Sequence, residues 1–557
     1  MDYLHDTLRS LFGFDAFLPG QQEAIDALLV GKDVLCILPT GAGKSLTYQL
    51  TGHLLHQKGR GVTLVVSPLI ALMKDQADAL AAHGWNNVGV LNSHVPAEEQ
   101  ARTMRRLAND ELALLYVTPE RLESPAFLER LVDAKVALLA VDEAHCVSQW
   151  GDDFRTAFLR LDEAVHVIRK SQRHPVPTLA LTATAPPLVR DEVIERLDLK
   201  DPVVVVCGFE RDNLDLQVEH IADESGKWAA LARRLGPDAN GSRLKPPGII
   251  YSATVRATEP IAEKLREWGW KALAYHGQMD REERQRAQES FMNGETEIVV
   301  ATNAFGLGID KQDLRFVLHW DLPGSPESYY QEAGRAGRDG KLATCLLFYH
   351  PNDRHLQAFF ASQGGPTETE VHTLWVTLGR IYKGVPLSIS EVAEQMTLKT
   401  GEVERLIRPL EEGCYLKRDE AGKLEILQFV PPAALELKMA GNMKRQAYDQ
   451  SRLKMMEAYA LTTDCRHEFL LNYLGQPYDN DDCGHCDNCR AGLSVKHNYD
   501  NSPFTPGDEV LHPSWGSGTV QRIEGSDGVT VLFPRVGYKT IALSIWEQNP
   551  GLLQHVA

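Results

Sequence analysis

The chain has 557 residues, of which 43% are hydrophobic and 24% are charged, a balance typical of globular proteins made of several domains. No apolar run is long enough to cross a bilayer as a helix. The net charge of −18 argues against a generally basic chain, so any path for nucleic acid must be local. The first residues lack the basic start and apolar centre of a signal peptide, so we expect a cytoplasmic protein with reduced thiols.

Short apolar runs alternate with helix-patterned segments over residues 1–205, and the alternation starts again over residues 206–350. This pattern is typical of parallel sheets covered on both faces. We therefore predict an α/β fold with two tandem parallel-sheet domains. The expected strands are 34–38, 63–66, 114–117 and 138–141 in the first domain, and 248–251, 298–301 and 316–319 in the second.

Three smaller units are expected after the second domain. Residues 365–430 show two short amphipathic helices and a hairpin, which predicts a winged-helix-like domain; a packing domain without DNA contacts fits the same pattern. Thr400 is the expected cap of the second helix, and Pro409 is expected to end or kink it. Residues 435–492 contain a helix pair with a cysteine cluster, and residues 506–557 contain short strands that suit a small β-barrel.

Residues 39–45 predict a phosphate-binding loop, because they follow a buried strand and open a helix. Glycines allow backbone N–H groups to approach the phosphates, and the helix N-terminus adds positive potential. Lys44 is expected to reach the β- and γ-phosphates. The predicted nucleotide-binding residues here are Thr40, Gly41, Ala42, Gly43, Lys44 and Ser45, with Ser45 also a magnesium ligand.

Acidic and basic groups that suit ATP hydrolysis lie in different domains. Asp142 and Glu143 follow a predicted strand, where one carboxylate can hold Mg²⁺ and the next can polarise the attacking water. Arg335 and Arg338 are three residues apart on an expected helical face of the second domain, and they can neutralise charge on the γ-phosphate. ATP is therefore expected to close a cleft between the two domains.

Four cysteines have the spacing of a metal site: Cys465, Cys483, Cys486 and Cys489. Four thiolates suit tetrahedral Zn²⁺ in a structural role, and an iron–sulfur cluster also uses four cysteines. His467 and His485 are expected to be bystanders.

These motifs resemble the RecQ family of superfamily-two DNA helicases, over residues 3–350 and 440–490. Segments 67–76, 118–122, 180–185 and 301–311 carry the resemblance, as does the aromatic-rich segment 146–155. It implies two RecA-like domains, an ATP-dependent helicase that moves 3′ to 5′ on single-stranded DNA and unwinds duplexes in repair and recombination, and zinc at the cysteines. The winged-helix-like segment precedes the cysteines here, so the chain resembles a bacterial type with an atypical C-terminal region.

The resemblance also implies roles for single residues. Phe14 and Gln21 would bind the adenine, Asp310 would contact the nucleotide, Asp142 would hold magnesium, and His145 and Gln331 would join the catalytic set. Asp152 stands where the family usually has histidine, which predicts altered coupling to DNA. The expected DNA contacts are Ser67, Lys74, Asn92, Thr118, Ser148, Gln149, Trp150, Phe154, Arg155, Ser252 and Thr302.

The expected partner is DNA, single-stranded or as a tailed or forked duplex. The C-terminal barrel is similar to the Tudor/SH3-like tail of other bacterial helicases, so repair or single-strand-binding proteins are further candidate partners. We expect a monomer that is associated with the nucleoid. An RNA helicase, or a nucleic-acid-stimulated ATPase without processive unwinding, is the alternative function; a non-catalytic scaffold conflicts with the complete set of ATPase residues.

Overall fold

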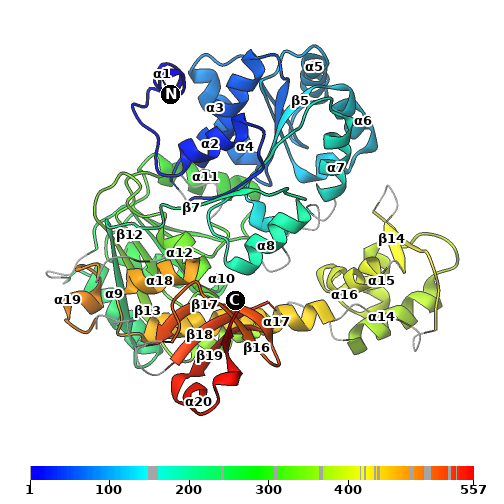
Figure 1. Ribbon diagram of the computed structural model, residues 1–557. Helices are drawn as coiled ribbons and strands as arrows, with labels where there is room; N and C mark the ends of the chain where they lie inside the picture. Colours follow the sequence, from blue (N-terminus) through cyan, green and yellow to red (C-terminus); the bar gives the residue numbers. More distant parts are fainter. Residues whose placement is uncertain are drawn as a thin grey trace.

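The computed structural model contains two α/β lobes, a separate small body, and a C-terminal sheet that packs near lobe 2 (Figure 1). It describes residues 2–39, 41–148, 158, 161–237, 239, 244–305, 311–362, 368–413, 415–418, 422–431, 435, 440–476, 478, 482–494, 503–524, 528–534 and 536–556. None of the helices within these ranges has both the length and the apolar character needed to span a membrane.

Lobe 1 contains a seven-stranded sheet in the order β3-β4-β2-β5-β6-β1-β7, with every neighbouring pair parallel. The inner strands are buried along their whole length, as expected for apolar runs covered on both faces. The strands are β1 (Val34–Ile37), β2 (Val62–Val66), β3 (Val88–Leu91), β4 (Leu114–Val117), β5 (Val136–Val141), β6 (Thr178–Thr182) and β7 (Val203–Val206). The helices are α1 (Asp2–Phe12), α2 (Gln21–Leu29), α3 (Lys44–Gln57), α4 (Ile70–Ala82), α5 (Ala97–Ala108), α6 (Pro125–Asp133), α7 (Leu161–Ser171) and α8 (Pro187–Arg196), with 3-10 turns η1 (Pro119–Glu123) and η2 (Ala144–Val147).

Lobe 2 contains a six-stranded parallel sheet in the order β10-β11-β9-β12-β13-β8. The three strands predicted from the sequence are β9, β11 and β12, which are adjacent to one another in the middle of this sheet. The strands are β8 (Leu214–His220), β9 (Gly248–Tyr251), β10 (Ala272–Tyr275), β11 (Ile298–Ala301), β12 (Phe316–His319) and β13 (Ala343–Tyr349). The helices are α9 (Glu224–Leu235), α10 (Val255–Glu267), α11 (Arg281–Met292), α12 (Pro326–Ala333) and α13 (Asp353–Ser362).

The winged-helix-like body stands apart from both lobes in Figure 1 and has a hydrophobic core of its own. The two predicted helices and the hairpin are present, but two details differ from the prediction. Lys399 rather than Thr400 is the N-cap of the second helix, and that helix continues through Pro409 to Glu412. The elements are α14 (Glu368–Ile381), α15 (Ile389–Met396), α16 (Thr400–Glu412), β14 (Leu416–Arg418) and β15 (Leu424–Ile426).

The C-terminal region combines a helical module with a five-stranded antiparallel sheet in the order β19-β18-β17-β16-β20. The sheet is docked on the helices: Tyr538 N donates to Ser451 Oγ at 3.1 Å, and the Tyr538 ring stacks on that of Tyr473 at 5.0 Å. The helices are α17 (Ala440–Leu461), α18 (Arg466–Leu474), α19 (Asp487–Arg490) and α20 (Leu543–Gln548), with the turn η6 (Pro550–Leu552). The strands are β16 (Glu509–His512), β17 (Gly516–Glu524), β18 (Gly528–Phe533), β19 (Gly537–Ala542) and β20 (Gln554–His555).

Candidate nucleotide, nucleic-acid and zinc sites

The predicted phosphate-binding loop lies between β1 and α3. Gly41 and Gly43 have φ angles of 89° and 65°, in the left-handed region that glycine adopts without strain. The Gln21 amide donates to the carbonyl oxygens of Ala42 at 2.9 Å and Gly43 at 3.1 Å, and Lys44 Nζ donates to Leu38 O at 3.2 Å. Gln21 therefore braces the loop in this structure, and the adenine contact stays a prediction.

The paired carboxylates follow β5, at the carboxyl edge of the lobe 1 sheet. Burial and the adjacent Glu143 carboxylate raise the pKa of Asp142 to about 7, while Lys44 and the Ser67 hydroxyl act in the opposite direction. Glu143 itself adopts a φ of 51°, and its carboxylate lies 3.4 Å from His145 Nδ1. An Mg²⁺ ion would favour the ionised form of Asp142, so the site fits a divalent cation.

His145 connects the carboxylates to the segment after β6. Its Nδ1 lies 2.9 Å from Thr182 Oγ1, and the Thr182 hydroxyl donates to Thr184 O at 2.9 Å. Because the hydroxyl proton is used in that second bond, His145 Nδ1 is the donor to Thr182. The acidic group and the Thr182–Thr184 segment are thus held as one unit.

Arg338 of lobe 2 lies against the phosphate-binding loop of lobe 1. A Cβ atom placed on Gly41 would lie 3.4 Å from Arg338 Cγ and 3.7 Å from Nε. The structure therefore brings Arg338 and the Lys44 loop to one place, although nearly 300 residues separate them in the chain.

The two arginines do not share a helical face, contrary to the sequence prediction. Helix α12 ends at Ala333, and the chain turns through Gly334 and Gly337, the latter with a φ of 60°. A Cβ on Gly337 would lie 2.4 Å from Asn213 Nδ2, so the turn needs glycine there. As a result, Arg335 faces a cavity of lobe 2 while Arg338 faces lobe 1.

This cavity of about 510 Å³ lies at the carboxyl ends of β9, β11 and β12. Ser252, Gln331 and Arg335, which the sequence singled out, line it together with Asp321. A buried ion-pair group that was not predicted from the sequence lies beside the cavity: Lys227 Nζ contacts Asp321 and Asp353, each at 2.8 Å. Asp321 also accepts from Ser252 Oγ at 3.1 Å, so this group fixes the position of Ser252. The position of Asp321 just after a predicted strand could have indicated this ion-pair group from the sequence.

The predicted DNA contacts fall into two rows. Ser67, Asn92 and Thr118 directly follow β2, β3 and β4, which are neighbours in the lobe 1 sheet. Ser252 and Thr302 directly follow β9 and β11, which are neighbours in the lobe 2 sheet. All five are buried in this structure, and their contact with DNA stays a prediction.

Other predicted residues are placed differently or lie outside the described ranges. Ser148 is fully buried and donates to Glu192 of α8 at 2.6 Å, whereas Phe14 is exposed. Lys74 lies on α4, and Ser45 lies in the first turn of α3. The residues outside the described ranges are Thr40, Gln149, Trp150, Asp152, Phe154, Arg155 and Asp310.

The four predicted metal ligands come together at the start of α18 and around α19. Their Sγ atoms all lie within 4.8 Å of one another; Cys486 and Cys489 are separated by 3.3 Å, and Cys483 and Cys489 by 3.8 Å. Sulfurs at Zn–S distances of about 2.3 Å in a tetrahedron are about 3.8 Å apart, so the cluster fits zinc. His467, Cys483 and His485 also have ligand atoms within 4.8 Å of one another. His467 Nε2 contacts the carbonyl oxygen of Leu214 at 3.0 Å, and the expectation that both histidines are bystanders stays a prediction.

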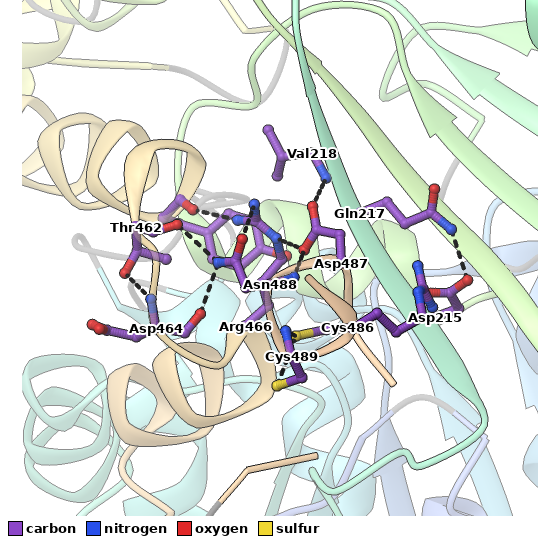
Figure 2. A network of polar contacts seen from close by, with 12 residues as sticks. Asp215, Gln217, Val218, Thr462, Asp464, Arg466, Cys486, Asp487, Asn488 and Cys489 are labelled. Carbon is purple, nitrogen blue, oxygen red and sulfur yellow. Dashed lines mark hydrogen bonds and ion pairs between the residues drawn. The ribbon is translucent and has the colours of Figure 1, made fainter. Parts of the chain in front are cut away.

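Polar side chains around this cluster attach it to lobe 2 (Figure 2). Asp487 of α19 pairs with Arg466 of α18 and accepts from the backbone N–H of Val218 in β8 at 2.7 Å. Asn488 donates to the carbonyl oxygens of Thr462 and Asp464, each at 2.8 Å. Contacts from α19, next to the cysteine cluster, therefore fix α18 and α19 against the edge strand of the lobe 2 sheet.

A phosphate-loop lobe joined to a second lobe whose arginine reaches that loop defines a two-lobed superfamily-two helicase motor. Three family models match this chain: the DEAD/DEAH box helicase over residues 18–192, the helicase conserved C-terminal domain over 226–340, and RecQ zinc-binding over 433–490. The probable ATP-dependent DNA helicase RecS of Bacillus subtilis is 33% identical over 492 residues, covering 87% of this chain and 92% of that protein. The chain belongs to the RecQ family of ATP-dependent DNA helicases.

Other relatives match a shorter region. The ATP-dependent DNA helicase RecQ of Pasteurella multocida is 42% identical over 348 residues, covering 62% of this chain and 52% of that protein. The chain thus spans about half the length of that RecQ relative. A crystal structure of the helicase MrfA bound to DNA and AMPPNP has a TM-score of 0.52 at 17% identity, covering 78% of this chain and 63% of that chain, and supports the fold alone.

Proposed function

We propose that this protein uses ATP to move 3′ to 5′ along single-stranded DNA and to unwind duplex DNA during repair or recombination. The approach of Arg338 to Gly41 is the observation that carries the proposal, because it completes a nucleotide pocket with groups from two lobes. Opening and closing of such a pocket converts hydrolysis into relative movement of the lobes. The direction of movement rests on membership of the RecQ family.

The proposed division of labour follows the geometry. Lys44 would bind the phosphates, Ser45 and Asp142 would hold magnesium, and Glu143 would polarise the attacking water. Arg338 neutralises charge on the γ-phosphate. The two rows of strand-end residues hold the DNA strand, one row on each lobe. A zinc ion held by the four cysteines would be structural, because four thiolates leave no open coordination position.

A strand-displacement assay with 3′-tailed, 5′-tailed and blunt duplexes tests the proposal, with the Glu143→Gln variant as the inactive control. We expect ATP-dependent unwinding of the 3′-tailed duplex. Unwinding only from a 5′ tail would contradict the polarity. ATPase rates measured with single-stranded DNA and with RNA separate the alternatives: stronger stimulation by RNA favours an RNA helicase, and stimulation without displacement favours a non-processive ATPase.

The cellular setting is part of the same proposal. A DNA substrate places the protein at the nucleoid, and the C-terminal sheet offers a surface for repair or single-strand-binding proteins. Co-purification of a tagged chain with and without residues 506–557 tests this: loss of a DNA-repair partner from the shortened chain is the expected result.

A further inference from the structure

Helix α8 of lobe 1 connects the hydrolytic site to the zinc module. It begins two residues after Ala185, at the end of the segment that binds His145 through Thr182. Glu192 in the same helix accepts from Ser148 Oγ at 2.6 Å, and Ser148 belongs to the aromatic-rich segment 146–155. A change in the position of α8 would therefore affect both the segment that contacts His145 and the segment that contains Ser148.

Arg190 is the residue through which α8 contacts the zinc module. Its Nε donates to Ala185 O at 2.7 Å, and its Nη2 donates to Leu474 O at 2.6 Å. Leu474 is the last residue of α18, so the guanidinium lies at the negative end of that helix dipole. Hydrogen bonds to a charged donor are roughly twice as strong as neutral ones.

Gly475 makes this close approach possible. It is the C-cap of α18, with a φ of 78°, and a Cβ there would lie 2.7 Å from Arg190 Nη2. Any other residue at this position would be strained and would also displace the arginine. The position therefore couples the end of α18 to the side chain of Arg190.

Helix α18 itself is fixed to lobe 2 and to the segment between the lobes. Tyr473 OH donates to Glu327 of α12 at 2.8 Å, and the next residue but two, Gln476, accepts from Phe209 N at 3.1 Å. The contact between Arg190 and Leu474 thus joins lobe 1 to a helix that is attached to lobe 2. It coexists with the approach of Arg338 to Gly41 on the nucleotide side.

We propose that Arg190 is a positioning residue that holds lobe 1 on the end of α18 and thereby favours the closed arrangement of the ATP cleft. The inference rests on the proposed ATP-driven function, and it assigns the zinc module a part in the affinity for nucleotide. When the closed arrangement is less populated, the apparent dissociation constant for ATP rises in inverse proportion to that population.

Equilibrium binding of a slowly hydrolysed fluorescent ATP analogue, without nucleic acid, is the test. We expect Arg190→Met to weaken binding about three- to tenfold, as loss of a partly exposed charged hydrogen bond implies, with zinc content unchanged. Arg190→Lys should recover part of the affinity, because it keeps the charge but loses the two-point geometry. Arg173→Met is the matched control, since Arg173 is an exposed arginine of the same lobe.

A double-mutant cycle separates positioning from simple stabilisation. If Arg190 acts through the end of α18, Gly475→Ala should weaken analogue binding and Arg190→Met should add little to it. Unchanged affinity in Arg190→Met, or fully additive effects, would overturn the inference. If Gly475→Ala does not fold, the comparison of Arg190→Met with Arg190→Lys and Arg173→Met still decides. Absence of DNA-stimulated hydrolysis in the wild type would instead count against the proposed function.

Discussion

Replacing Arg452 by methionine should destabilise the contact between α17 and α12 strongly. Arg452 Nε lies 2.9 Å from Glu327 Oε1, and the side chains of the two residues are only 6% and 5% exposed. At an effective dielectric constant of about 20, two charges at this distance attract by about 6 kcal/mol. The desolvation cost offsets part of this, but removal of one partner leaves a buried charge, and such changes typically cost about 3–5 kcal/mol.

The measurement is denaturant unfolding of Arg452→Met, Glu327→Gln and the double variant, following the transition that releases zinc. We expect each single variant to lower the free energy of that transition by about 3–5 kcal/mol, and the double variant to lose less than the sum of the two. Arg354→Met is a matched control, because its ion pair with Glu457 is more exposed, with the two side chains 46% and 21% exposed, and is expected to contribute at most about 1 kcal/mol. A loss below about 1 kcal/mol in Arg452→Met would refute the reasoning.

Four further outcomes are expected. Because the pKa of Asp142 is raised to about 7, protons compete with Mg²⁺ for this carboxylate below that pH. The Mg²⁺ concentration for half-maximal ATPase activity should therefore rise about tenfold per pH unit below about 7 and stay constant above it. A flat profile from pH 5 to 8 would contradict this prediction. Without metal, the same shift predicts that lobe 1 loses stability as the pH rises from about 4 to 7, because the folded form holds the extra proton. Arg338→Ala should lower ATP turnover by about 10³-fold without changing the melting temperature. Unchanged turnover in this variant would contradict the proposal that both lobes form the nucleotide pocket. Replacing residues 368–431 by a flexible linker should leave DNA-stimulated ATPase activity within about twofold, because that body has its own core; a large loss would show that it carries part of the DNA site.

The sheets were predictable to the extent that the strands are apolar along their whole length. All seven strands expected from the sequence are present, and they occupy inner positions of the two sheets. The outer strands β3 and β7 are partly exposed. A glycine, Gly89, interrupts the apolar run of β3, whereas β7 consists of four valines and was missed although it is apolar throughout. β8 alternates apolar and polar residues, because one side of it faces the zinc module.

Short sequence motifs predicted which residues lie in a site better than they predicted the tertiary contacts around those residues. The spacing of the four cysteines and the sequence around Lys44 depend on short-range geometry, and the structure assembles both sites. The expectation of a helix through Arg335 and Arg338 was wrong, because two glycines and a contact with Asn213 turn the chain there. The contact from Arg190 to Leu474 joins residues 284 positions apart, and local sequence patterns do not report such tertiary pairs.

The route of the chain around the winged-helix-like body has a consequence for how the protein can vary. The chain leaves the core at the end of α13 and returns along α17, and Arg354 near the start of α13 pairs with Glu457 in the last part of α17. These two helices act as the stem of a hairpin whose connecting loop is an entire folded unit. A stem of this kind tolerates exchange, shortening or removal of its loop, because the entry and exit points stay anchored to each other.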